Sequence, residues 1–366
     1  MKIPTFQECR EEEEMGRVYS REDENYILFC YAQRTQYDNL WNDVNIWCRG
    51  IIFEKETKSL VALPFKKFFN LNERPETQMG NLKDKTILRI AEKVDGSLGI
   101  VFYDKFEDKL RVSTKGALGS PQAIWATKWI NNPKNYPENG MLYEDLKKHL
   151  SFNKTLLVEI IYPENRVVVD YGQFEGFIIL CQMDLLGNLL YNFPAPKWPK
   201  ATSHHFKSIE DAVNQAEVLT ENEEGYVLTF EDGLMVKIKG KEYLRIHRLY
   251  SKLSYKNVWE MLSDGQNPDE HFSRLPDEFF EEAKQIKNEI LAWKKEFEGE
   301  FDQKISSIKS SFGGNRKMLA KWAENNLEIE FRPPFFLTLS GQMEKLDDYF
   351  WKLVFKKKIK NKEADK

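Results

Sequence analysis

Lys93 lies two residues before an Asp-Gly step, in a segment whose residue types and spacing could perform nucleotidyl transfer. The pattern Lys93-x-Asp95-Gly96 stands between two apolar runs, and the Asp-Gly step favours a turn, so the lysine is predicted at a strand end. A lysine amine placed there could attack the α-phosphate of a nucleotide. The pattern is short enough to arise by chance, and a plain β-hairpin with a solvated lysine is the alternative.

A lysine can act as this nucleophile only while its amine is neutral. The usual pKa of a lysine is about 10.4, so only about one amine in a thousand is neutral near pH 7.4. Nearby cations and partial burial lower that pKa, and the same cations would balance a triphosphate and its leaving pyrophosphate. The sequence should therefore hold further basic residues that project inward from strands, together with one or two carboxylates.

Two such lysines stand near the end of the strand-rich part of the chain. Lys237 and Lys239 alternate with Val236 and Ile238, so both lysines are expected on one face of a strand. Glu224 lies at the entry to the hairpin that would deliver them. An amphipathic strand with its lysines in water is the alternative interpretation.

Glu159 is the one carboxylate in the apolar run 155–161. It would share a strand face with Leu157 and Ile161, so that face is expected to be half buried. An unpaired charge in such a place costs several kcal/mol, and we therefore expect Glu159 to be paired, bound to a ligand, or close to a metal. A structural salt bridge is the alternative.

Further cations with aromatic neighbours occur before and after Lys93. Arg49 stands at a predicted strand start, where a guanidinium could make a two-pronged phosphate contact. Lys67 and Phe69 belong to a segment rich in lysine and aromatic residues that could stack on a base. Lys115 follows the strand after the nucleophile turn.

The elements that must position these residues change in type along the chain. Short β-rich runs alternate with turn signals from about Tyr26 to Lys239, and helices are expected at 121–131 and 142–150. This pattern predicts an α+β domain over 1–242 with mainly antiparallel sheets. The predicted strands are 51–53, 98–103, 110–113, 155–161, 166–169, 177–181, 226–230 and 234–238, with a hairpin at Asp232-Gly233.

The remaining part, 243–366, is predicted to form an all-α domain. Apolar residues recur every three or four positions from Phe279 to Ile308, which indicates one long amphipathic helix between Pro276 and Gly313. Further helices are expected at 316–324 and 343–355, separated by Arg332-Pro333-Pro334. The chain ends in a lysine-rich run, for which a solvated tail and RNA phosphate contact are both open.

Charge, cysteine content and missing motifs exclude several classes of protein. The 366 residues include 54 basic and 58 acidic side chains, so any nucleic-acid surface must be local. We find no apolar run of transmembrane length, no secretory leader and no phosphate-binding loop of P-loop kinases. The four cysteines and five histidines match no zinc, disulfide or triad pattern, and this use of cysteine favours a cytoplasmic location. Because a transmembrane run is missing, we expect no membrane partner.

The motifs also follow one another in a recognisable order. Cys-Arg-Gly-Ile-x-Phe is followed by Lys-Phe-Phe-Asn-Leu-Asn-Glu, Lys-x-Asp-Gly-Ser-Leu, Lys-Gly, an apolar strand with Glu, Glu-Gly-Tyr-Val and Lys-Ile-Lys. From about Arg49 to Lys239 this order and its spacing resemble the RNA ligase 1 family, whose type member is the T-even phage enzyme that reseals cut tRNA. The resemblance implies a nucleotidyltransferase domain, ATP-grasp-like in fold. Tyr31 would correspond to the family's tyrosine near the phosphates, although its spacing differs by a few residues.

The resemblance implies a role for each matching position. Lys93 would carry covalent AMP, Lys115 would match a family lysine needed for catalysis, and Lys237 and Lys239 would bind the α-phosphate. Glu159 would hold the ribose or help to bind the metal, and Glu224 would serve the metal or the adenylate. The residues implied in nucleotide binding are Arg49, Lys67, Phe69, Asp95, Gly96, Glu159, Glu224, Lys237 and Lys239.

By the same resemblance, the chain would be an ATP-dependent RNA ligase that joins 5′-phosphate and 3′-hydroxyl ends through lysyl-AMP and RNA-adenylate. ATP and Mg²⁺, with Mn²⁺ as a substitute, are the implied cofactors. Nicked tRNA is an implied substrate in RNA repair, a phage or virus origin would fit, and a separate end-healing enzyme is an implied partner. The C-terminal helices would take an RNA-recognition role.

Other functions share part of this chemistry. DNA ligases and mRNA-capping guanylyltransferases also use a lysine nucleophile, but those families follow the Lys-x-Lys strand with a small β-barrel, whereas helix is predicted here. A catalytically inactive scaffold that only binds nucleic acid is the remaining alternative.

Overall fold

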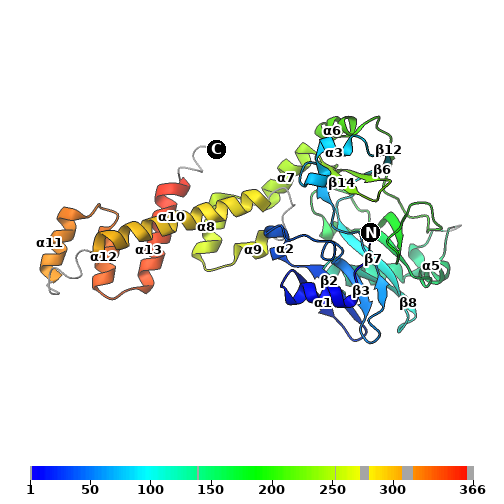
Figure 1. Ribbon diagram of the computed structural model, residues 1–366, viewed down its shortest axis with the longest axis horizontal. Helices are drawn as coiled ribbons and strands as arrows, with labels where there is room; N and C mark the ends of the chain where they lie inside the picture. Colours follow the sequence, from blue (N-terminus) through cyan, green and yellow to red (C-terminus); the bar gives the residue numbers. More distant parts are fainter. Residues whose placement is uncertain (1, 138–139, 252, 273–279, 307–315, 361–366) are drawn as a thin grey trace. The chain divides into compact units, whose positions relative to one another are not determined.

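The computed structural model describes residues 2–137, 140–251, 253–272, 280–306 and 316–360. The chain divides into two compact units, Met1–His247 and Arg248–Lys366, and each unit is described by itself. The first unit combines sheets with short helices, and every element described after Lys239 is helical (Figure 1). The predicted α+β class is therefore confirmed.

The described strands of the first unit form three sheets. Their orders are β1-β2-β3-β4, β11-β10-β9-β7-β8 and β12-β6-β13-β14-β5, and all pairs except β14 with β5 are antiparallel. The strands are β1 (Val18–Glu22), β2 (Tyr26–Tyr31), β3 (Arg49–Glu54), β4 (Leu60–Ala62), β5 (Phe69–Asn70), β6 (Ile87–Glu92), β7 (Ser97–Asp104), β8 (Lys109–Thr114), β9 (Lys154–Ile161), β10 (Gly176–Asp184), β11 (Leu189–Leu190), β12 (Ser203–His204), β13 (Gly225–Phe230) and β14 (Met235–Lys239).

The sheet that contains β7 and β9 is buried on both faces. Alternate residues of β7 enter different cores: Ile100 packs with β2 and β3, whereas Val101 packs with the helices α4 and α5. A third core lies between the sheet containing β13 and the helix α6. The helices of this unit are α1 (Phe6–Glu14), α2 (Gln33–Tyr37), α3 (Met79–Leu82), α4 (Pro121–Ile130), α5 (Tyr143–Leu150) and α6 (Ile209–Glu217).

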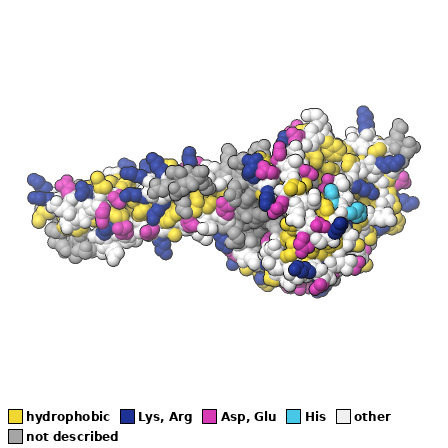
Figure 2. Space-filling model, turned by 90° about the horizontal axis from the view of Figure 1, so that it is seen from above, with side chains coloured by type: hydrophobic (Ala, Val, Ile, Leu, Met, Phe, Trp, Pro, Cys, Tyr) yellow, Lys and Arg dark blue, Asp and Glu magenta, His cyan; other side chains and the backbone are white. Residues whose placement is uncertain are grey.

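The helical unit has a core of its own, in which phenylalanine rings pack with leucine, isoleucine and alanine side chains. Phe301 of α10 is buried with Phe335 and Phe350, which come from α12 and α13. On the face shown in Figure 2, basic and acidic side chains alternate along this unit rather than gathering by sign. The helices are α7 (Lys241–Ser251), which crosses the boundary between the units, α8 (Tyr255–Ser263), α9 (Pro268–Phe272), α10 (Phe280–Ser306), α11 (Arg316–Asn326), α12 (Arg332–Leu339) and α13 (Glu344–Val354).

Most predicted elements are confirmed, including the β13–β14 hairpin at Asp232-Gly233, where Gly233 has a φ of +78°. The long helix α10 matches the apolar stripe, whose predicted start at Pro276 and stop at Gly313 lie outside the described residues. Within those residues, none of the helices combines the length and apolar character that a membrane crossing needs.

Two sequence-based expectations about secondary structure are wrong. The run 166–169 is not a strand, because the amides of Val168 and Val169 bind the carboxylate of Asp95 instead of a neighbouring strand. Arg332-Pro333-Pro334 does not separate two helices but begins α12. Proline is tolerated in the first turn of a helix, where its missing N–H would have had no intrahelical partner.

Candidate active site

The nucleophile candidate lies where the chain passes from one five-stranded sheet to another. Strand β6 ends at Glu92, and β7 begins at Ser97 in the neighbouring sheet. The amide of Lys93 donates to the carbonyl oxygen of Gly225 at 2.8 Å, which continues the pairing of β6 with β13. Because β6 and β7 do not pair with each other, the β-hairpin alternative for this segment is wrong.

A glutamate joins two of the candidate lysines. Oε2 of Glu224 lies 2.6 Å from Nζ of Lys93, and its Oε1 lies 3.2 Å from Nζ of Lys239. The pairing of Gly225 with Lys239 across β13 and β14 sets this geometry. The side chains of Glu224 and Lys239 are 3% and 8% exposed, so the interpretation of Lys239 as a solvated lysine is wrong.

The two lysines keep Glu224 ionised. Burial raises the pKa of this carboxyl, but the charges of Lys93 and Lys239 and their hydrogen bonds outweigh it, and the pKa falls below its usual range. Glu224 in turn holds both ammonium groups within one small volume. Such an arrangement can position a lysine amine beside a second cation that would face an incoming phosphate.

The turn after Lys93 is fixed through Asp95, whose side chain is 5% exposed. Oδ2 of Asp95 accepts hydrogen bonds from the amides of Val168 and Val169 at 2.8 and 2.9 Å, and Oδ1 accepts one from the hydroxyl of Tyr243 at 2.9 Å. Burial, together with the charge of Glu224, raises the pKa of Asp95 although the two amides act in the opposite direction.

Gly96 lets the turn approach β9. A Cβ at this position would lie 2.7 Å from the carbonyl oxygen of Ile160 and 3.1 Å from Cγ of Glu159, so a larger residue could not be accommodated without a shift. The half-buried Glu159 therefore lies beside the turn. Burial raises the pKa of Glu159 to about 8, and the charges of Glu224 and Asp95 act in the same direction, whereas the charges of Lys93 and Arg49 lower it.

A second group of candidate residues surrounds Tyr31 at the end of β2. Nζ of Lys115 lies 3.4 Å from the hydroxyl of Tyr31. Lys67 is 6% exposed, and its Nζ lies 5.4 to 6.0 Å from the ring centroids of Phe69, Trp41 and Tyr31. Cations over aromatic faces are stabilised by the ring quadrupole. This cage stabilises the Lys67 cation at low exposure.

Backbone pairing connects the two groups. Strand β5 runs parallel to β14, with Phe69 opposite Val236 and Asn70 opposite Lys237, which is 8% exposed. Phe69 itself packs edge-on against Trp41, with ring centroids 5.6 Å apart.

Arg49 begins β3 beside Lys115. Gly50 has a φ of +102°, and a Cβ there would come within 3.1 Å of Cα of Lys115, so only glycine permits this approach. The guanidinium of Arg49 lies 5.9 Å from the ring centroid of Phe68. Its charge also acts on the pKa of Glu159, which links the second group to the first.

The expected residues thus fall into two neighbouring groups, one around Glu224 and one around Tyr31. Three further residues take part that sequence reasoning did not single out: Trp41, Tyr171 and Tyr243. Tyr171 accepts a hydrogen bond from the amide of Asp95 at 2.9 Å. Tyr243 follows Lys239 by four positions, a spacing that could have drawn attention to it, whereas nothing local marks Trp41 or Tyr171.

The carboxylates suit a metal that is shared with a substrate. No group of three or more histidine, cysteine, aspartate or glutamate side chains that could hold a metal occurs in the part of the chain that the structure describes. Glu159 and Glu224 lie close enough for their charges to interact. Magnesium commonly binds through one or two carboxylates, with phosphate oxygens and water completing its coordination.

Comparison with known sequences decides the family. A sequence profile described as RNA ligase matches residues 47–243, which is more than half of the chain and includes the group around Glu224 and, except for Tyr31 and Trp41, the group around Tyr31. The chain belongs to the RNA ligase family. The matched region ends at Tyr243, the residue that binds Asp95.

Known proteins that are similar to this chain differ in sequence identity and in the share of each chain that the similarity covers. The RNA ligase of Rhodothermus phage RM378 is 20% identical over 395 residues, with 89% of this chain and 88% of that protein covered. A Thermovibrio ammonificans protein, provisionally named an RNA ligase, is 29% identical over 217 residues, with 56% and 54% covered. The chain therefore spans about half the length of the Thermovibrio relative. A variant of the Naegleria gruberi RNA ligase, solved with ATP and Mn, is 16% identical over 50% of this chain and 58% of that chain, with a TM-score of 0.37.

Proposed function

We propose that this member of the RNA ligase family is an ATP-dependent ligase that joins RNA 5′-phosphate and 3′-hydroxyl ends. The observation that carries the proposal is the contact of Glu224 with both Lys93 and Lys239, which gathers a nucleophile and a phosphate-binding cation at one point. An ordinary surface lysine has no such partners. The family match supplies RNA as the substrate class.

In the first step, the amine of Lys93 would attack the α-phosphorus of ATP. A P–N bond forms, the bond to the β-phosphate oxygen breaks, and pyrophosphate leaves. Lys93 must lose a proton before it attacks, so its ion pair with Glu224 describes the resting state. Lys237 and Lys239 would balance the charge on the α-phosphate as the leaving group departs.

The Tyr31 group would bind the outer phosphates. Lys67, Lys115 and Arg49 are three cations on neighbouring elements, and the aromatic rings around Lys67 stabilise its charge at low exposure. Glu159 and Glu224 would hold Mg²⁺, which supplies charge neutralisation for the triphosphate. Without the metal, the raised pKa of Glu159 allows its protonated carboxyl to donate a hydrogen bond to a ribose hydroxyl, and binding of Mg²⁺ would displace that proton.

In the later steps, AMP would pass to the RNA 5′-phosphate, and a 3′-hydroxyl would then displace it. Repair of nicked tRNA, with a separate enzyme that prepares the ends, is the pathway we propose for this activity. The helical unit would contribute RNA recognition. In the view of Figure 2, basic and acidic side chains are mixed along this unit and do not form a single basic face.

The experiment is incubation with Mg²⁺ and ATP labelled on the α-phosphate, in parallel with labelled GTP, followed by denaturing electrophoresis. We expect acid-labile label from ATP on the wild-type chain and none on Lys93→Ala. The matched control is Lys148→Ala, an exposed lysine of α5, which should label normally. Label from GTP would indicate capping chemistry, and no label from either nucleotide would overturn the proposal.

A further inference from the structure

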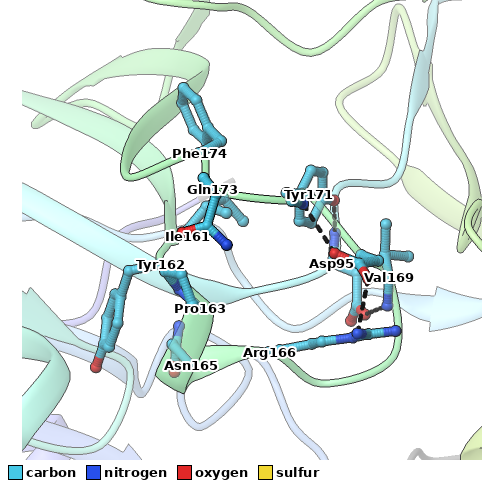
Figure 3. A pocket seen from close by; sticks show the side chains of 12 residues that line it. Asp95, Ile161, Tyr162, Pro163, Asn165, Arg166, Val169, Tyr171, Gln173 and Phe174 are labelled. Carbon is cyan, nitrogen blue, oxygen red and sulfur yellow. Dashed lines mark hydrogen bonds and ion pairs between the residues drawn. The ribbon is translucent and has the colours of Figure 1, made fainter.

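A cavity of about 310 Å³ opens beside the nucleophile turn, and the proposed nucleotide chemistry does not use it. It begins at Asp95 and extends along the loop that follows β9. Figure 3 shows Asp95 and Tyr162 at opposite sides of the cavity, with Arg166 and Asn165 along one edge and Gln173 and Phe174 along another. This volume is at the lower end of the range for small-molecule sites, about 300 Å³, and suits a single nucleoside.

One wall of the cavity belongs to an aromatic stack. The ring of Tyr162 stacks on Trp125 of α4, with centroids 4.4 Å apart and planes 23° apart. Trp125 stacks in turn on Trp129 at 6.3 Å and 20°. Tyr162 and Trp125 are only half buried. Aromatic side chains of this kind are the usual platform for unpaired bases of single-stranded RNA.

The edge of the cavity that Arg166 and Asn165 form is polar and carries little positive charge. Arg166 is 45% exposed and pairs with Asp170 at 2.9 Å. Asn165 accepts a hydrogen bond from the hydroxyl of Ser97, the first residue of β7, at 3.1 Å. Together with Asp95, the lining therefore holds one guanidinium and two carboxyl groups. A terminal phosphate with two negative charges would be poorly matched, whereas a hydroxyl and one phosphodiester would fit.

We propose that this cavity binds the 3′-terminal nucleoside of the RNA strand that supplies the attacking hydroxyl. The inference rests on the proposed ligase function. A base would stack on Tyr162, and Arg166 would contact the phosphodiester next to the terminal nucleoside. The terminal hydroxyl would lie toward the Asp95 side, two residues from Lys93.

The position of the cavity agrees with what the sealing step demands. The 3′-oxygen attacks the phosphorus of the RNA-adenylate, a new P–O bond forms, the bond to the AMP phosphate breaks, and the hydroxyl proton leaves to solvent. The attacking oxygen must approach within about 3–3.5 Å of that phosphorus. A strand bound in this cavity would place its terminal hydroxyl near the turn that carries Lys93, because Asp95 of that turn lines the cavity. The cations around Glu224 and Tyr31 would then bind the phosphates.

Kinetics with a pre-adenylated donor RNA test the assignment, because this donor bypasses ATP. We expect Tyr162→Ala and Arg166→Gln each to raise the KM for acceptor RNA about tenfold, an effect on the scale of one lost stack. Tyr162→Phe keeps the ring and should restore the wild-type KM. The matched control is Phe152→Ala, an aromatic residue that is 64% exposed in the segment before β9.

Labelling by ATP separates this inference from the proposed function. The variants should form lysyl-AMP at the wild-type rate, and unchanged acceptor KM values on such labelled proteins would overturn the cavity assignment alone. A fall in lysyl-AMP formation equal to the fall in sealing would also overturn it, since the cavity would then serve the nucleotide. No lysyl-AMP on the wild-type chain would instead overturn the ligase function.

Photo-crosslinking gives a readout that does not depend on catalysis. An acceptor RNA with 4-thiouridine at its 3′ end should crosslink within the peptide 162–174 of the full chain. A donor RNA with 4-thiouridine next to its 5′-phosphate should crosslink elsewhere. Crosslinking of the donor end, rather than the acceptor end, to this peptide would show that the occupant is the wrong strand and would overturn the assignment.

Discussion

The hydroxyl of Tyr243 donates a hydrogen bond to the buried carboxylate of Asp95, a residue 148 positions earlier in the chain. Tyr243 belongs to the helix that follows β14, and Nζ of Lys239 lies 5.4 Å from its ring centroid. One side chain therefore contacts both the turn after Lys93 and the strand that carries Lys237 and Lys239. It links the two segments whose alignment the proposed first step would require.

Tyr243→Phe should weaken both the fold and the first step. The change removes a hydrogen bond to a buried carboxylate, and we expect a loss of about 1.5–3 kcal/mol in the free energy of unfolding. Lysyl-AMP formation should slow because the turn loses its support. The control Tyr103→Phe removes a hydroxyl that binds the exposed Asp108, and both quantities should remain close to wild type. Urea denaturation and ATP labelling measure the two effects.

Glu224→Gln removes the negative charge of this residue while it keeps nearly the same size, and it should reduce the labelling of Lys93. Removing one partner of a buried ion pair costs about 3–5 kcal/mol, because the remaining charges lose their compensation. Lys93 and Lys239 would then repel each other, and the labelling of Lys93 should fall by at least tenfold. Glu221→Gln, an exposed residue of the same loop, is the control. Wild-type labelling of Glu224→Gln would contradict the role assigned to the contact.

Glu159→Gln should stabilise the protein at alkaline pH. The pKa of this carboxyl is about 8 in the folded chain against 4.5 in the unfolded chain, so the folded state binds the proton more tightly. The cost of ionising Glu159 is absent below pH 4.5, grows as the pH rises, and is complete above pH 8. Because some solvent contact remains, we expect a gain of about 2–4 kcal/mol at pH 8.5. Equal Tm differences at pH 5 and pH 8.5 would disagree with this account.

Lys67→Met should weaken ATP binding while the fold is retained. Methionine keeps a similar length within the cage of Phe69, Trp41 and Tyr31 but removes the charge. We expect the KM for ATP to rise by about 10–100-fold, since a lost charged contact costs about 1.5–3 kcal/mol. Lys148→Met on α5 serves as the control. An unchanged KM on a folded protein would remove Lys67 from the proposed phosphate site.

Much of the strand framework could be predicted because its signals are local. The apolar runs that became β7, β9 and β10 are bounded by turn residues, and Asp232-Gly233 supports the hairpin that presents Lys237 and Lys239. The family motifs lie on these elements, so the sequence also indicated which side chains would share a site. Their clustering follows from strand alternation and from antiparallel pairing.

The remaining features depend on contacts between distant residues. The sequence of Lys93-x-Asp95-Gly96 does not reveal that β6 and β7 belong to different sheets, since the strands on either side of a turn commonly pair. The run 166–169 has strand-forming residues, yet its amides are taken by Asp95. Trp41 and Tyr171 carry no local sign of their partners.

The passage of the chain between two sheets at Lys93 affects how long an activated nucleotide could be stored. A small cluster that includes Ala91 of β6, Val94 of the crossing segment and Ile161 of β9 packs at this seam. If AMP is held on Lys93 between steps, the packing of this cluster would help to keep water away from the phosphoramidate. The lifetime of the lysyl-AMP intermediate would then depend on the packing of this seam as much as on the reacting groups.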